Sequence, residues 1–254
     1  MKKIIKETIK SIVRRTGFDI VRYQSNKKPL NLADLTDREI EIVDSVKPYT
    51  LTGDERIATL IKAVGYITEH KIPGNIAECG VWRGGSMMAV ARALMSHGDL
   101  SRHLYLYDTF EGMSEPTEHD QRFSGESAKS LLDREPVGVW HLVSIEDVRT
   151  NVLSTGYPEE NVHFIKGKVE ETLPSELPDR LALLRLDTDW YESTKHELTH
   201  LFPLLNLYGI LIIDDYGHWK GARKAVDEYL TDHKLNLYLH RVDYTCRVAV
   251  RTGA

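Results

Sequence analysis

The stretch that decides the fold is Ile76–Met88, which reads IAECGVWRGGSMM. Its apolar beginning runs into Glu78, and Gly84, Gly85 and Ser86 then open a segment with the composition of a helix. A strand followed by a glycine turn and a helix is typical of α/β proteins that bind a nucleotide-like ligand at the end of the strand. The first question about this chain is therefore whether such a ligand carries phosphates.

The glycine spacing argues against a phosphate ligand. After Gly80, the bulky residues Val81 and Trp82 stand where the dinucleotide fingerprint has a glycine that lets the backbone approach a pyrophosphate. The Walker pattern is also missing, because no Lys-Ser or Lys-Thr pair follows the last glycine. The acid at the end of the strand, Glu78, repels phosphate and suits a cation, such as the amino group of a methionine-like moiety. A glycine turn of this kind can also serve only tight packing.

Strand-like and helix-like segments alternate on both sides of this stretch. Helices are expected at residues 54–70, 84–98, 193–205 and 221–233, the third of them capped by Ser193 or Thr194. Strands are expected at residues 72–79, 103–108, 161–167, 181–187 and 208–215, with two more in the closing stretch 235–252. This alternation predicts an α/β, Rossmann-like fold, with a mostly parallel sheet of seven strands, helices on both faces and an antiparallel strand at the C-terminus.

The charge is unevenly distributed along the 254 residues, which carry −5 in total. Residues 1–28 hold nine basic and two acidic side chains, a charge of +7, so the rest of the chain carries −12. An acidic body argues against nucleic-acid binding. We divide the chain into a basic amphipathic segment, residues 1–30, and a functional domain, residues 31–254. Within that domain the polar stretch 109–150 is expected to form a lid, because long loops in compact domains are usually functional.

The basic segment allows two interpretations. Isoleucines recur in it near helical spacing, with basic residues between them, which is typical of an amphipathic helix. Such a helix either packs on a domain or a partner subunit, or attaches weakly to an anionic membrane surface. The two cysteines are too few for a disulfide framework, and no signal peptide or membrane-spanning run is predicted. We therefore expect a cytoplasmic location, with peripheral membrane contact through residues 1–28 as the alternative.

A second acid, Asp108, ends the strand that follows the glycine turn and its helix. In Rossmann-like folds a carboxylate at this position accepts hydrogen bonds from the ribose hydroxyls of the cofactor. Both NAD and S-adenosylmethionine need such an acid. An acid-ended glycine turn that lacks a pyrophosphate site, combined with a ribose acid, favours S-adenosylmethionine.

Four more carboxylates follow two predicted strands: Asp187 and Asp189 after LALLRL, and Asp214 and Asp215 after ILII. The two strands are separated by one helix, so we expect them to be neighbours whose carboxyl ends meet at one edge of the sheet. Like charges at close range are costly unless they share a cation. Mg²⁺ is the economical solution, since it binds a few carboxylates and keeps positions for water or substrate oxygens. Alternatively, one Asp of each pair caps a helix and the others are solvated.

A metal and a methyl donor together suggest how a hydroxyl group could be methylated. Coordination to a metal lowers the pKa of a hydroxyl, and a carboxylate that is not a ligand then takes the proton. The acceptor would carry two vicinal hydroxyls, on a sugar or on a catechol. His141 and His218 are further candidates for ligands or bases, but a lone histidine is more often an ordinary residue.

Six motifs occur in order along residues 45–235: PYTLTGDERI (48–57), IPGNIAECGVWRGGSMM (72–88), YDTFEGMSEPTEHD (107–120), GKVEETLP (167–174), LLRLDTDWYEST (183–194) and IIDDYGHWKGARKAVDEY (211–229). Together they resemble the macrocin/mycinamicin O-methyltransferase family. Members of that family are enzymes of the Rossmann-like class I methyltransferase fold that use S-adenosylmethionine and Mg²⁺ to methylate sugar hydroxyls. The resemblance implies the same activity here, on a glycosylated natural product or a surface-glycan precursor, and a homo-oligomer.

The resemblance also implies roles for individual residues. Asp189 would be the general base, and Tyr49 would lie near the acceptor sugar. The metal would be held by Asp187, Asp214 and Asp215. The cofactor would be bound by Glu78, Gly80, Trp82, Gly84, Gly85 and Ser86 around its methionine part, and by Asp108 and Phe110 around its ribose.

Two departures separate this chain from the antibiotic-tailoring members. Lys168 and Val169 stand where those relatives have an aromatic pair, so the wall of the adenine pocket differs. The basic N-terminus suits an acceptor carried at a membrane better than a macrolide. Three alternatives stay open: a metal-dependent hydrolase in which the glycine turn is only structural, a non-catalytic member that binds the cofactor or a partner, and a catechol-type phenol O-methyltransferase.

Overall fold

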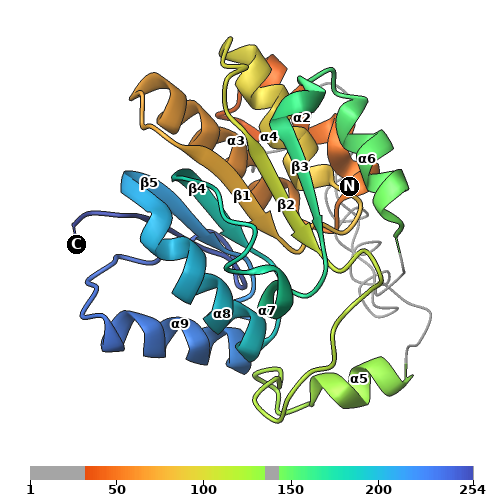
Figure 1. Cartoon of the computed structure of the whole chain (residues 1–254), viewed down its shortest axis with the longest axis vertical. Helices are drawn as coiled ribbons and strands as arrows, with labels where there is room; N and C mark the ends of the chain where they lie inside the picture. The colour runs from red at the N-terminus through yellow and green to blue at the C-terminus, as the bar shows by residue number, and fades with distance from the viewer. Residues whose placement is uncertain (1–31, 135–142, 254) are drawn as a thin grey trace, which may run out of the picture. The chain divides into compact units, whose positions relative to one another are not determined.

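The computed structural model describes residues 32–134 and 143–253, and a seven-stranded sheet lies at its centre (Figure 1). The strand order is β3-β2-β1-β4-β5-β7-β6. The first five strands are parallel, and β7 runs antiparallel to both β5 and β6. The strands are β1 (Asn75–Cys79), β2 (Leu104–Asp108), β3 (Val162–Lys166), β4 (Leu181–Leu186), β5 (Leu205–Ile213), β6 (His240–Arg241) and β7 (Arg247–Val250).

This topology confirms the predicted fold class. The sheet is mostly parallel, it ends in an antiparallel strand, and β4 and β5 are neighbours as expected. β1 lies between β2 and β4, so the strand order reverses there and the glycine turn stands at the topological switch point. The predicted basic segment 1–30 and His141 lie outside the described residues, and membrane contact and a homo-oligomer stay predictions.

Helices cover both faces of the sheet (Figure 1). α4 packs with α2, α3 and α6, whereas α8 packs with α7 and α9 on the other side. Among the described helices, none is long and apolar enough to cross a bilayer. The helices are α2 (Asp37–Val46), α3 (Asp54–Glu69), α4 (Gly85–Ser96), α5 (Ala128–Arg134), α6 (Ile145–Leu153), α7 (Val169–Thr172), α8 (Tyr191–Leu201) and α9 (Lys220–Asp232), with short 3₁₀ turns at Lys47–Tyr49, Glu159–Asn161 and Phe202–Leu204.

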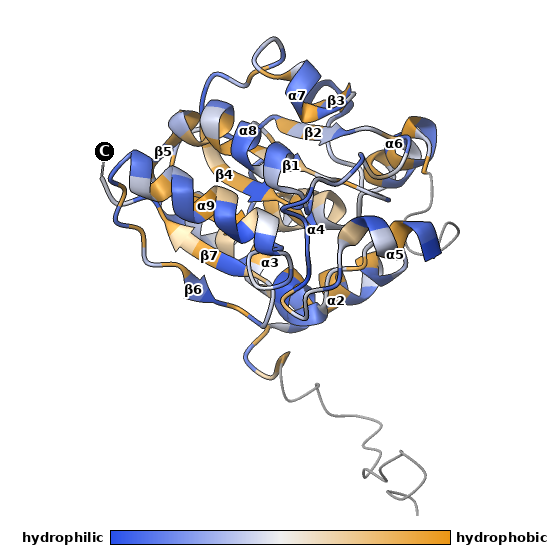
Figure 2. Ribbon diagram, turned by 90° about the horizontal axis from the view of Figure 1, so that it is seen from below, coloured by the Kyte–Doolittle hydropathy of each residue, from blue (hydrophilic) through white to orange (hydrophobic). Residues whose placement is uncertain are grey.

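The hydrophobic pattern explains which faces meet. All six residues of β4 are buried, as expected for a central strand that is covered on both sides. Hydrophobic and hydrophilic residues alternate along α9 (Figure 2), which buries Ala222, Ala225, Val226 and Tyr229. This is the spacing of an amphipathic helix that packs one face on a sheet and exposes the other.

The predicted cap of α8 is wrong. The helix begins at Tyr191, and Trp190 in the cap position makes no side-chain hydrogen bond to the helix, so Ser193 and Thr194 lie inside its first turn. The cap comes instead from Asp120, whose Oδ1 accepts a hydrogen bond of 2.8 Å from the Tyr191 N–H. An acid beside a helix N-terminus is favourable, because it pairs with free N–H groups and with the positive end of the helix dipole.

The stretch predicted as a lid is anchored at this same residue. The fully buried Asp120 accepts hydrogen bonds from the N–H (2.6 Å) and hydroxyl (2.9 Å) of Thr117. Gly221 of α9 lies so close that an added Cβ would be 2.1 Å from Asp120 Oδ1. The residues around Asp120 therefore form a fixed wall against α8 and α9. That the remainder of residues 109–150 closes over a ligand stays a prediction.

Candidate active site

A cavity of about 460 Å³ lies at the carboxyl ends of β1, β2, β4 and β5. The polar residues that follow these strands converge on it, as parallel strands require. Nine of the predicted site residues line the cavity: Gly80, Trp82, Ser86, Asp108, Phe110, Asp187, Asp189, Asp214 and Asp215. The other four, Tyr49, Glu78, Gly84 and Gly85, do not line it.

The glycines of the turn allow segments to pack closely. An added Cβ at Gly80 would lie 2.0 Å from the carbonyl oxygen of Asp187, and one at Gly85 would lie 2.5 Å from that of Tyr49. Gly84 has a left-handed backbone with φ of 89°, and an added Cβ there would meet a valine of α6 at 2.8 Å. The turn therefore holds β1 against β4 and α4 against the Lys47–Tyr49 turn, and only Gly80 also faces the cavity.

Three residues that line the cavity have an uncommon left-handed backbone. The φ angles are 47° for Trp82, 51° for Phe110 and 67° for Asp189. Each such conformation costs about 1–3 kcal/mol in a residue other than glycine, and it persists where surrounding contacts determine it. Strain at three of the four strand ends around one cavity is typical of a functional site.

Asp108 fixes the glycine turn to β2. Its Oδ2 accepts hydrogen bonds from the N–H groups of Val81 (2.7 Å) and Trp82 (3.0 Å), and its Oδ1 accepts one from Phe110 N–H (2.7 Å). The Thr109 hydroxyl also lies 3.4 Å from Oδ1, but its single proton has a shorter partner, the Gly112 carbonyl at 2.5 Å. A carboxylate has about four acceptor positions, so roughly one remains for a ligand in the cavity. Asp108 thus shapes the turn in addition to the ribose contact predicted for it.

Glu78 is held by an arginine that sequence reasoning did not consider. The Glu78 side chain is buried, its Oε1 pairs with Arg185 Nη1, and its Oε2 has no hydrogen-bond partner among the described residues. Burial raises the pKa of Glu78 to about 7, and the charge of Arg185 opposes this. The predicted contact with a cofactor amino group stays a prediction, and Glu78 also has a structural role as the partner of Arg185.

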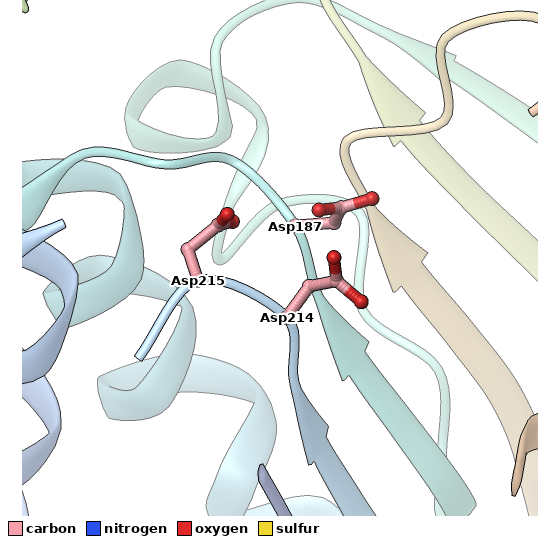
Figure 3. Close-up of side chains that lie close together, drawn as sticks. All are labelled: Asp187, Asp214 and Asp215. Carbon is pink, nitrogen blue, oxygen red and sulfur yellow. The ribbon is translucent and has the colours of Figure 1, made fainter. Parts of the chain in front are cut away.

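The three predicted metal ligands lie together. One carboxylate oxygen from each of Asp187, Asp214 and Asp215 lies within 4.8 Å of the others. Figure 3 shows their carboxylates pointing toward a common space, Asp187 from the end of β4 and the other two from the end of β5. Asp214 and Asp215 are buried. This is the convergence that the pairing of β4 with β5 predicts.

Two guanidinium groups reach this acidic cluster. Arg185 on β4 donates from Nη1 to Asp187 Oδ2 (2.7 Å) and from Nη2 to Asp214 Oδ1 (2.8 Å). Arg56, in the first turn of α3, pairs through Nη1 with Asp214 Oδ2 and through Nε with Asp243 Oδ2 (3.2 Å). Asp214 is therefore paired with arginine through both of its oxygens.

The positive charges of the two arginines do not neutralise all the carboxylates of the acidic cluster. Burial, followed by the charge of Asp214, raises the pKa of Asp187 well above its ordinary value. Burial, followed by the charge of Asp189, does the same for the pKa of Asp215. Asp215 lies beside the Asp189 carboxylate, and its Oδ2 is buried with no hydrogen bond of normal geometry among the described residues. An unpaired acceptor amid surplus negative charge fits a small hard cation, and the all-oxygen set is one that Mg²⁺ prefers.

Asp189 is placed to act as a base. Burial and the nearby charge of Asp187 raise the pKa of Asp189 to about 7. Its Oδ1 accepts a hydrogen bond of 2.7 Å from Trp219 Nε1, which fixes the carboxylate at the cavity wall. A general base works best when its pKa lies near the operating pH.

The outer wall of the cavity comes from the β6–β7 turn, which sequence reasoning left aside, together with His218 and the residues after Tyr49. Tyr244 lies in the β6–β7 turn, is 58% exposed, and bonds through its hydroxyl with His218 Nδ1 (3.0 Å). Burial, and then the charges of Arg122 and Arg56, lower the pKa of His218 and favour its neutral form. Tyr49 lies beside this wall with Arg83 5.8 Å from the centre of its ring, and the residues after it, Thr50 to Thr52, line the cavity.

The cavity also offers groups that fit the predicted cofactor. Trp82 Nε1 is buried and has no hydrogen-bond partner among the described residues, and Asp108 keeps acceptor capacity. A smaller pocket joins the cavity through Gly80, Asp108 and Asp187 and continues to Lys168 and Val169. This is where an adenine ring would follow a ribose held by Asp108.

Only one of the residues that sequence reasoning missed carried a signal of its own. Arg185 is a charged residue within the apolar run LALLRL, and a charge in a buried strand must be paired. Arg56 and Asp120 carry no comparable signal, because their partners lie 158 and 71 residues further along the chain.

Sequence comparison finds one family for this chain. A sequence model of the macrocin-O-methyltransferase (TylF) family matches residues 11–251. A demethyldecarbamoylnovobiocin O-methyltransferase of Streptomyces niveus is 34% identical over 181 residues, which are 71% of this chain and 67% of that protein. An 8-demethyl-8-(2,3-dimethoxy-α-L-rhamnosyl)-tetracenomycin-C 4′-O-methyltransferase of Streptomyces olivaceus is 35% identical over 197 residues, 78% of this chain and 73% of that protein.

Structure comparison agrees with the sequence. The solved structure of the O-methyltransferase NovP superposes with a TM-score of 0.72 and 32% sequence identity. The superposition covers 81% of this chain and 83% of that one. The resemblance predicted from the six motifs is therefore confirmed.

Proposed function

This chain belongs to the macrocin O-methyltransferase family and is an O-methyltransferase, and from that premise we propose that it transfers a methyl group from S-adenosylmethionine to a sugar hydroxyl with the help of Mg²⁺. The observation that carries the proposal is the placement of Asp187, Asp189, Asp214 and Asp215 across one cavity from Trp82, Ser86 and Asp108. A hydrolase would need no such cofactor wall, and the two relatives compared are O-methyltransferases by name.

The cofactor would lie along the glycine turn. Asp108 would accept a ribose hydroxyl, and the small pocket at Lys168 and Val169 would take the adenine. Ser86 and Trp82 would face the methionine part, where Trp82 Nε1 supplies an unused donor. The fixed turn would hold the sulfonium methyl toward the acidic side of the cavity, and alignment of reacting groups alone can contribute roughly 7–11 kcal/mol.

The acceptor hydroxyl would be deprotonated by Asp189. As the acceptor oxygen bonds to the methyl carbon, the bond from that carbon to sulfur would break, and the hydroxyl proton would pass to the Asp189 carboxylate. S-adenosylhomocysteine, which is neutral at sulfur, is the second product. Trp219 keeps the carboxylate in place through the 2.7 Å hydrogen bond to Oδ1.

Asp187, Asp214 and Asp215 would hold the metal ion. When bound there, Mg²⁺ would lower the pKa of a coordinated hydroxyl group and would favour an acceptor with two vicinal oxygens. Thr50, Thr52, His218 and Tyr244 would surround the sugar on its other side. The exposed ring of Tyr244 gives the C–H face of a sugar a flat surface to pack on.

The acceptor class can be tested with defined compounds. One relative acts on a rhamnosyl group by its name, so methyl and p-nitrophenyl α-L-rhamnopyranosides are the first acceptors, with catechol as the phenol. The protein is incubated with methyl-labelled S-adenosylmethionine in Mg²⁺ or in EDTA. We expect label in a rhamnoside in Mg²⁺ and none in EDTA. Label in catechol alone would contradict the sugar assignment, and equal transfer in EDTA would contradict the role of the metal.

A further inference from the structure

Arg56 and Arg185 both pair with Asp214, but they differ in burial and in the number of contacts that fix each side chain. Arg185 lies on a central strand with its side chain 3% exposed, and it is bound to Glu78, Asp187, Asp214 and the Thr52 hydroxyl. Arg56 reaches in from the first turn of α3 with its side chain 18% exposed, and its two partners come from different segments. Arg185 is therefore a fixed part of the core, whereas Arg56 approaches the cluster from its edge.

Asp214 does not need Arg56 to keep its orientation. Arg185 Nη2 donates to Asp214 Oδ1 at 2.8 Å, and the Asp214 N–H donates to the Leu186 carbonyl at 2.9 Å, so both the side chain and the backbone are held independently. What Arg56 adds is one positive charge on the remaining oxygen, Oδ2. A metal ion held by the same carboxylates would meet that charge at short range.

From this geometry we propose that Arg56 is a built-in competitor of the divalent cation: its guanidinium neutralises Asp214 in the metal-free protein and lowers the affinity of the carboxylate triad for metal. The inference rests on the proposed function, because it takes Asp187, Asp214 and Asp215 to be the metal site. Two charges of the same sign a few ångströms apart repel measurably even at an effective dielectric constant of about 20. Asp187 also acts on the charge of Arg56, so the guanidinium lies within electrostatic range of two of the three carboxylates.

Asp243 sets how strongly Arg56 competes. Its Oδ2 pairs with Arg56, while its Oδ1 accepts hydrogen bonds from the N–H groups of Thr245 (2.9 Å) and Cys246 (2.8 Å). Asp243 shares the positive charge with Asp214 and lies outside the triad. Removing its charge leaves more of the guanidinium charge facing the metal site.

The test is a titration of the full chain with Mn²⁺, in which the electron paramagnetic resonance signal of free Mn²⁺ reports how much metal is bound. This measurement needs no acceptor. Arg56→Gln should bind Mn²⁺ roughly tenfold or more tightly than the wild type, because the competing charge is gone. Arg56→Lys keeps the charge and should stay within about twofold. Asp243→Asn should bind a few-fold more weakly, since an asparagine oxygen still accepts from Thr245 and Cys246. Arg149→Gln, a surface pair with Glu159, is the control that should change nothing.

The outcomes separate this inference from the proposed function. Equal or weaker binding by Arg56→Gln would mean that Arg56 only orients Asp214, as outer partners of metal ligands often do, and would overturn the inference. Should Arg56→Gln not fold, the direction of change in Asp243→Asn decides, because tighter binding there contradicts the competitor role. Absence of Mn²⁺ binding in both the wild type and Arg56→Gln overturns the metal in the proposed function and this inference together.

Discussion

Two regions line one cavity: the glycine turn after β1 and the carboxylates after β4 and β5. Close packing without side chains holds the glycine turn in place, whereas charge determines what the carboxylates can bind. In the turn, an added Cβ at Gly80 or Gly85 would meet backbone atoms within 2.5 Å. In the cluster, Asp189 and Asp214 are held by directed bonds from Trp219 and Arg185 that an isosteric amide could still accept. The comparison teaches that substitutions should harm the turn through folding and the cluster through chemistry.

The largest expected effect is on turnover, at Asp189. Asp189→Asn keeps the volume and the oxygen that accepts from Trp219, but it removes the proposed base. We expect kcat for methyl transfer to fall by about 10²–10⁴, with the melting temperature and S-adenosylhomocysteine affinity within error of the wild type. Asp232→Asn, an exposed acid of α9, is the control and should keep full activity. Full activity of Asp189→Asn would show that Asp189 is not the base, and it would contradict the view that substitutions in the acidic cluster act through chemistry.

The next effect is on stability, at Gly80. Gly80→Ala puts a methyl group against the Asp187 carbonyl at φ of +83°, so we expect the free energy of unfolding in urea to fall by about 3 kcal/mol or more. Gly98→Ala is the matched control, because its φ is +72° with nothing within 4 Å of the added Cβ. It should lose only about 1 kcal/mol from the backbone term. Equal losses in the two variants would show that close packing does not explain the turn.

The sheet and its glycine turn show what the sequence could and could not predict. Local and topological rules predict part of the structure. The alternation of strands and helices predicts the parallel sheet and the glycine turn at its switch point, and the adjacency of β4 and β5 brings the two Asp pairs together. That Gly80 packs against the Asp187 carbonyl, and that Asp120 caps α8, depends on contacts between distant segments. Periodicity carries no information about such contacts.

The acidic cluster shows the same limit in its charges. Four acids at two strand ends predict a cation, and the structure provides guanidinium groups in addition to room for a metal. Arg185 could have been found, because a charge within a buried strand requires a partner. Arg56 could not, since nothing in DERI distinguishes an arginine that reaches Asp214 from one on an exposed helix surface.

A smaller effect concerns Glu197, an acid of α8 that belongs to neither region. It is fully buried, its Oε1 accepts from the Thr188 hydroxyl (2.8 Å), and burial raises its pKa to about 8. The unfolded chain releases this proton near the ordinary value of 4.5, whereas the folded protein keeps it until about pH 8. The stability that Glu197 contributes is therefore complete below about pH 4.5 and is lost as the pH rises to about 8.

Glu197→Gln should remove this dependence. We expect the free energy of unfolding of the variant to fall less than that of the wild type between pH 5 and pH 8, by up to about 1.4 kcal/mol per pH unit. Urea melts at several pH values measure the difference. Glu171→Gln, an exposed acid of α7, should follow the wild type. Parallel curves for Glu197→Gln and the wild type would contradict the assignment of a buried neutral acid.

The last expected effect is that of metal removal on the fold, which should be small. Arg56 and Arg185 already pair with the acidic cluster, so chelation should leave the protein folded. Adding Mg²⁺ to about a hundred times its Kd should stabilise the native state by roughly 2.7 kcal/mol, a shift of roughly 5–10 °C in the melting temperature. Unfolding at 25 °C in EDTA would contradict the view that the arginines hold the cluster without metal.

The measurement that tests the central claim most directly is calorimetric titration of S-adenosylhomocysteine into the wild type, Asp108→Ala and Asp214→Asn, with NAD as the control ligand. The claim that the glycine-turn side binds the cofactor and the acidic side the metal predicts binding to the wild type and to Asp214→Asn with similar affinity. It predicts at least about tenfold weaker binding to Asp108→Ala, and none of NAD to any variant. No binding of S-adenosylhomocysteine to the wild type, or binding of NAD in its place, would contradict the claim.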